Sequence, residues 1–104
     1  GDIFGGWLLS QMDIAGGILS KQIARGRTAT IAIDAMKFIR PVQVGDVVCC
    51  YGTVVRRGTT SLTLRLEVWI QPVIREAECA YLKVTEANFT FVAIDDDGQK
   101  RPLP

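Results

Sequence analysis

A chain of 104 residues with a hydrophobic fraction of 48% is long enough for one domain with a real core. Its 12 basic and 11 acidic residues give a net charge of +1, so overall charge makes no case for nucleic-acid binding. The chain has no histidine, which excludes Ser-His-Asp and Cys-His nucleophiles. Any catalysis must therefore use carboxylates, hydroxyls and backbone dipoles.

The apolar segments and the cysteines predict where the protein is located and whether it has partners. No apolar run approaches the ~20 residues that span a bilayer, and no segment has the order of a signal peptide, so we expect a cytoplasmic protein without a membrane partner. The high hydrophobic fraction indicates that a partner subunit covers apolar surface. Three cysteines without CxxC spacing indicate buried thiols rather than disulfides or a metal site: Cys49, Cys50 and Cys79. Because the chain starts at Gly1 without an initiating Met, we expect that an upstream segment has been removed.

The first predicted element is a long helix over 5–25, which Gly26 ends. Asp13 lies in the middle of this otherwise apolar segment, where an unpaired charge is costly. It belongs to a stripe of residues along one face of the helix, in which all residues except Asp13 have small side chains. The stripe consists of Gly6, Ser10, Asp13 and Gly17. Such a groove lets another backbone or a slender ligand lie against the helix. The alternative is a buried acid that caps or bridges the helix.

Strand-forming segments and turn residues fill the rest of the chain. We predict strands over 28–39, 47–56, 61–69 and 81–94. In the third strand Leu62, Leu64, Leu66 and Val68 share one face and Thr63, Arg65 and Glu67 the other, which predicts one wet face. A polar connection begins at Pro72, a turn spans 95–98, and residues 99–104 are expected to trail from the domain.

This order of elements predicts an α+β domain in which an antiparallel sheet curls around a long central helix. Such a wrapping would explain why the helix is apolar around most of its circumference. The alternative is a plain two-layer packing of helix on sheet, which would leave one polar helix face exposed. Polar residues of that kind occur near the end of the helix, at Ser20, Lys21 and Gln22.

The segments GDIFGGWLLSQMD and FIRPVQVGDVVCCYG resemble the hotdog-fold acyl-CoA thioesterases, specifically the YciA-like group. The resemblance covers essentially the whole chain and implies a single hotdog domain over 1–104 that lacks an N-terminal strand and part of a C-terminal tail. It implies hydrolysis of acyl-CoA in fatty acid metabolism, with coenzyme A as part of the substrate and no other cofactor. It also implies a homodimer that assembles further, to a hexamer as a trimer of dimers.

The same resemblance assigns the candidate catalytic residues. Asp13 matches the family's catalytic acid, either as general base on water or as nucleophile through an anhydride. The helix start at Gly5 and Gly6 offers backbone N–H groups that can hold a developing oxyanion. Asp2 either positions water or substrate, or caps the helix. Because Gly6 and Asp13 are about 10 Å apart along one helix, we expect the two halves of the site to come from two antiparallel helices of different subunits.

Two groups of residues are candidates for contacting the CoA portion of the substrate. A turn with guanidinium, hydroxyl and glycine groups suits phosphate or pantetheine, and Arg40 before Pro41 is a further candidate. The turn comprises Arg56, Arg57, Gly58, Thr59, Thr60 and Ser61. Solvated hairpin charges are the alternative. Likewise Phe38, Phe89 and Phe91 either line an acyl tunnel or belong to the core.

Three other functions compete with hydrolysis. A non-catalytic acyl-CoA-binding or sensing domain would use the same fold with a structural Asp13. A hydratase or dehydratase of this fold characteristically pairs a histidine with its acid, and the chain has none. A purely structural dimerisation domain would bind no ligand.

Overall fold

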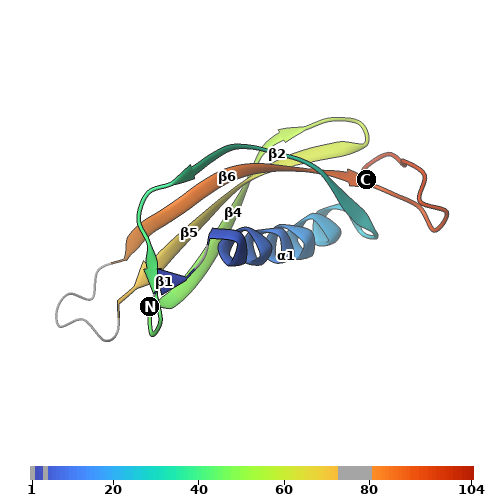
Figure 1. The fold of residues 1–104 in the computed structure, drawn as a ribbon. Helices are drawn as coiled ribbons and strands as arrows, with labels where there is room; N and C mark the ends of the chain where they lie inside the picture. The colour runs from blue at the N-terminus through green and yellow to red at the C-terminus, as the bar shows by residue number, and fades with distance from the viewer. Residues whose placement is uncertain (1, 4, 73–80) are drawn as a thin grey trace.

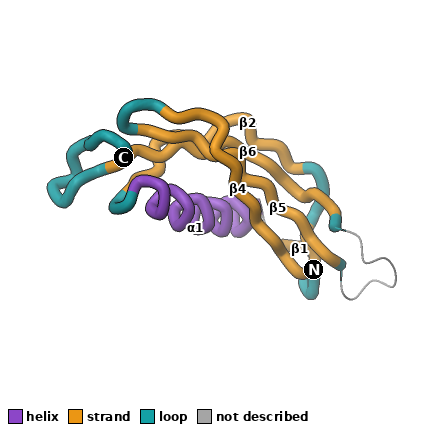
Figure 2. The backbone as a smooth tube through the Cα atoms, turned by 180° about the vertical axis from the view of Figure 1, so that it is seen from behind, coloured by secondary structure: helices purple, strands orange, loops and turns teal. Residues whose placement is uncertain are grey.

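The computed structural model describes residues 2, 3, 5–72 and 81–104 as a long helix against one face of an antiparallel sheet (Figure 1). In chain order the elements are β1 (Asp2–Ile3), α1 (Gly5–Ala24), β2 (Thr28–Phe38), β3 (Val42–Gln43), β4 (Val47–Arg57), β5 (Ser61–Gln71) and β6 (Leu82–Ala93). The main sheet has the order β2-β6-β5-β4, and β1 pairs with β3 in a separate ladder. The sheet arches over the helix, which confirms the predicted α+β class (Figure 2).

The alternation predicted for the third strand is confirmed in β5. Leu62, Leu64, Leu66 and Val68 are at most 1% exposed and form the core against the helix. Arg65, on the opposite face, is exposed, and its neighbours Thr63 and Glu67 are half-buried. Each of the four predicted strands begins and ends within two residues of an observed one. The alternation of apolar residues, together with the turn residues, therefore predicted the strands of the main sheet correctly.

The end of α1 differs by one residue from the prediction. Ala24 is the last helical residue, and Arg25 takes the left-handed conformation with φ of 56°. The N–H of Gly26 then donates to the carbonyl of Lys21 at 3.2 Å, the bond that closes a Schellman motif. The left-handed residue is therefore Arg25, and Gly26 is the residue after it.

The C-terminal residues are fastened to the domain, so the expectation that they trail away is wrong. Leu103 packs against the core, and its N–H donates to the carbonyl of Thr59 at 2.8 Å. The Arg101 guanidinium donates to the carbonyl of Ala24 at 2.9 Å and to that of Ile94 at 3.1 Å. A cation at this position also suits the negative end of the helix dipole.

The helix contacts the sheet through every fourth residue, and Gly16 is the point of closest approach. The buried positions are Leu8, Met12, Gly16, Ser20 and Ala24. A Cβ at Gly16 would lie 2.8 Å from the side chains of Leu66 and Phe91, so only glycine allows this spacing. On the other side of the helix Trp7, Ile14 and Ile18 are 44%, 55% and 57% exposed. The sheet therefore covers one side of the helix and leaves apolar residues open on the other.

We expect Gly16→Ala to lower the free energy of unfolding by about 1–3 kcal/mol, because overpacking outweighs the better helix propensity of alanine. Gln22→Ala, at an exposed position of the same helix, serves as the control and should change stability little. Urea unfolding followed by circular dichroism measures both. An unfolding midpoint of Gly16→Ala at or above the unaltered value would show that the helix does not pack this closely.

Two sequence expectations concern cysteines and the membrane. Cys49 and Cys50 are free and half-buried, and burial raises the pKa of the Cys50 thiol. Cys79, and the connection after Pro72, lie outside the described residues. Within the described part of the chain, no helix has the length and apolar character needed to cross a membrane.

Candidate functional site

Asp13 lies on the flank of α1 that is next to edge strand β2. Its side chain is exposed, and Thr30 on β2 donates a hydrogen bond to its Oδ1 at 2.6 Å. The carboxylate lines a cavity of about 500 Å³, together with Lys21, Thr28 and the ring of Phe91. Within the described chain the alternative of a buried acid is therefore wrong. The carboxylate is open to solvent and held in one orientation by a hydroxyl group.

The stripe of small residues runs along the same flank of α1 as Asp13. Gly6 and Ser10 are exposed and Gly17 is half-buried. A Cβ at Gly6 would meet nothing within 4 Å, and one at Gly17 would approach the Nζ of Lys21 at an ordinary 3.5 Å. The stripe thus leaves room for another backbone. Along the axis Asp13 and Gly6 remain about 10 Å apart, too far for both to touch one carbonyl carbon.

The start of α1 borders a second cavity. Gly5 is the first helical residue, and a Cβ there would lie 3.1 Å from the ring of Phe38. The cavity beside it has a volume of about 320 Å³. In the first turn of a helix the backbone N–H groups lack intrahelical acceptors and carry the positive end of the dipole. Gly6 in that turn has open space next to it, so its backbone is accessible.

Asp2 does not occupy the position directly before α1, where an N-cap residue lies. It lies in β1, paired with Gln43 of β3, and three positions before the first helical residue. The β1–β3 ladder was not expected from the sequence, because each strand has two residues and shows no periodicity. The ladder brings the chain before the helix beside the segment that follows β2. A role of Asp2 in positioning water or substrate stays a prediction.

The candidate CoA-binding residues lie at two ends of the domain. The turn that holds Arg56, Gly58, Thr60 and Ser61 joins β4 to β5 at the end of the sheet where β2 begins, since Ser61 and Ala29 both pair with Val92. There the Arg57 guanidinium donates to the carbonyl of Pro104. Arg40 lies near the start of α1, and its Nε donates to the carbonyl of Lys83 at 2.9 Å. A helix of 20 residues is about 30 Å long, so one chain does not bring these groups together.

The three phenylalanines have different surroundings. Phe89 and Phe91 are at most 1% exposed and stack with ring centroids 6.3 Å apart, as expected of core residues. Phe91 also forms part of the cavity at Asp13. Phe38 is 57% exposed and lines the other cavity, at the helix start. The three rings therefore do not line a common tunnel in the described chain.

Thr30 is the site residue that sequence reasoning missed. In the sequence it reads as an ordinary β-branched strand former, and its contact with Asp13 spans 17 residues. Its place on an edge strand next to the helix brings the hydroxyl to the carboxylate. Among the described residues, no group of three or more His, Cys, Asp and Glu side chains is arranged to hold a metal ion.

Comparison with known proteins assigns this chain to a family. Residues 1–77 match the thioesterase superfamily. A Salmonella typhimurium protein named acyl-CoA thioester hydrolase YciA is 58% identical over 104 residues, which are 100% of this chain and 78% of that protein. The chain belongs to the thioesterase superfamily and, within it, to the YciA-like acyl-CoA thioester hydrolases, which confirms the resemblance seen in the sequence.

Solved structures agree with this assignment. HI0827, described as a hexameric broad-specificity acyl-coenzyme A thioesterase and solved as an aspartate-to-alanine mutant, superposes with a TM-score of 0.97 at 50% identity. The match covers 100% of this chain and 75% of that one. Cj0915 of Campylobacter jejuni, described as a hexameric hotdog fold thioesterase, superposes with a TM-score of 0.93 at 40% identity, covering 100% of this chain and 78% of that one. The fold is therefore the hotdog fold.

Proposed function

We propose that this chain hydrolyses acyl-CoA thioesters to a free carboxylic acid and coenzyme A. The observation that carries the proposal is the exposed carboxylate of Asp13, which lies between the helix and edge strand β2 and accepts a hydrogen bond from Thr30. A chain of the acyl-CoA thioester hydrolase family with an oriented carboxylate in an open cavity has what hydrolysis without histidine requires.

Asp13 acts in one of two ways. As general base it takes a proton from water while the water oxygen adds to the thioester carbonyl carbon; the C–S bond then breaks and the thiolate sulfur takes the proton. As nucleophile its carboxylate adds to the same carbon, the C–S bond breaks, and water then hydrolyses the anhydride. In both routes the hydrogen bond from Thr30 to Oδ1 orients the carboxylate, and the first turn of a helix holds the oxyanion.

We further propose that each active site combines two subunits. Since Asp13 and Gly6 of one helix are about 10 Å apart, two antiparallel helices across a two-fold axis supply the acid and the oxyanion site to one substrate. The exposed apolar residues Trp7, Ile14 and Ile18 on the helix and Ile31 and Ile33 on edge strand β2 support such an interface. The homodimer assembles to a hexamer as a trimer of dimers, in line with the hexameric relatives.

A thiol-release assay over a panel of acyl-CoAs, from acetyl to palmitoyl, tests the proposal. We expect release of free CoA thiol with at least part of the panel. Binding of acyl-CoA, measured by calorimetry, without any thiol release would instead assign the chain as a non-catalytic acyl-CoA sensor. If neither binding nor release occurred, a structural dimerisation domain would be the remaining function.

A further inference from the structure

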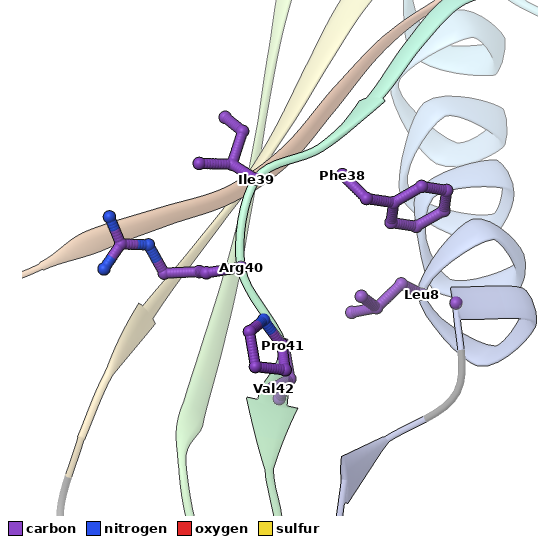
Figure 3. Close-up of a pocket in the computed structure, with 7 residues that line it drawn as sticks. Leu8, Phe38, Ile39, Arg40, Pro41 and Val42 are labelled. Atoms are coloured by element: carbon purple, nitrogen blue, oxygen red, sulfur yellow. The ribbon is translucent and has the colours of Figure 1, made fainter.

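The cavity at the start of α1 is lined by apolar side chains together with exposed polar atoms. Its lining residues are Gly5, Leu8, Phe38, Ile39, Arg40, Pro41 and Val42. Leu8 and Val42 are at most 2% exposed and form its buried side, while the Phe38 ring, 57% exposed, forms a wall next to the helix (Figure 3). The charged group of Arg40 points away from Leu8 and Phe38 in Figure 3, and its Nε donates to the carbonyl of Lys83. Apolar side chains therefore form part of the wall of this cavity.

The cavity at Asp13 has a different character. Four of its eight lining residues are polar or charged: Asp13, Lys21, Thr28 and Thr30. In an acyl-CoA thioester the acyl chain is hydrocarbon, whereas the pantetheine arm carries amides and a hydroxyl group. Burial of hydrocarbon favours contact between the acyl chain and apolar side chains such as Leu8, Phe38 and Val42.

Phe38 reaches this cavity because of an irregularity in β2. Asp34 pairs with Asn88, and Lys37 pairs with Glu86, so an extra residue interrupts the register between them. Within that bulge Ala35 has φ of 53°, a conformation that non-glycine residues rarely adopt. Strict alternation from Asp34 would put Phe38 on the face away from the helix; the bulge turns it toward Gly5.

We propose that this cavity receives the acyl group of the substrate and that Phe38 sets the acyl chain length. The inference rests on the proposed thioesterase activity. A thioester oxygen held by the N–H groups of the first helical turn starts the acyl chain next to the Phe38 ring, since that ring contacts the position of a Cβ at Gly5. The ring then limits how many methylene groups enter.

The test compares kcat/KM over a series of saturated acyl-CoAs for the unaltered protein, Phe38→Ala and Phe38→Trp. Phe38→Ala should shift the preference to longer chains, with a gain of about fourfold for each additional methylene group that becomes buried. Phe38→Trp should shift it to shorter chains. Tyr51→Ala, which removes an exposed ring from β4, is the matched control and should keep the original profile.

Size-exclusion chromatography of each variant tests whether the assembly is unchanged. If Phe38→Ala does not fold, the length profile of Phe38→Trp alone tests whether Phe38 sets the acyl chain length. An unaltered protein that hydrolyses none of the series would overturn the proposed function. An active protein whose Phe38→Ala and Phe38→Trp variants keep the original length profile would overturn the acyl-cavity assignment while leaving the proposed function in place.

Discussion

Asp13→Asn is expected to lower kcat for acyl-CoA hydrolysis by about 100- to 10,000-fold, because the amide neither accepts a proton from water nor attacks the thioester. The fold should persist, since Asp13 is exposed and an asparagine oxygen can still accept the hydrogen bond from Thr30. Thiol release measures the rate, thermal unfolding measures the stability, and calorimetry with CoA measures binding.

The matched control is Asp34→Asn, which makes the same change at an exposed aspartate of β2 paired with Asn88. Its kcat should stay close to the unaltered value. Full activity in Asp13→Asn would remove Asp13 from the mechanism. A loss of activity that accompanied unfolding would assign Asp13 a structural role instead.

Gly6→Pro is expected to lower kcat by about 100- to 1000-fold, because proline removes one backbone N–H from the oxyanion site. The helix tolerates proline in its first turn, and a Cβ at Gly6 meets nothing within 4 Å. The measurement is kcat at saturating acyl-CoA, with circular dichroism to verify helix content.

Gly6→Ala separates the missing donor from the added carbon. Alanine keeps the N–H and places its methyl group in open space, so Gly6→Ala should retain far more activity than Gly6→Pro. Equal losses in the two variants would mean that added bulk, and not the lost N–H, impairs the enzyme. That outcome would contradict the assignment of the helix start as oxyanion site.

The sequence predicted those parts of the fold that repeat a local pattern. The alternation of Leu62, Leu64 and Leu66 identified the buried face of β5, and the helix was located to within one residue. Asp13 was found because a charge in an apolar segment violates that pattern. Its exposure could not be read from its neighbours, since the helix has apolar residues on both its buried and its open sides.

Features that depend on long-range contacts were missed. The hydroxyl of Thr30 reaches Asp13 only after β2 folds beside the helix, and Gly16 is required by Leu66 and Phe91 from other strands. The bulge at Ala35 has no turn residue to mark it. The C-terminal residues looked like a trailing segment because their partners, such as Ala24 for Arg101, lie elsewhere in the chain.

The most direct test of the two-subunit active site is complementation between Asp13→Asn and Gly6→Pro subunits. Each variant alone is expected to be nearly inactive, and the two are co-expressed with different affinity tags so that mixed assemblies can be purified. In a mixed pair, Asp13 of one subunit meets the unaltered helix start of the other at one of the two sites. Random mixing should therefore restore roughly one quarter of the unaltered activity, since half of the pairs are mixed and each keeps one intact site. Mixed assemblies no more active than either parent would contradict an active site shared between subunits.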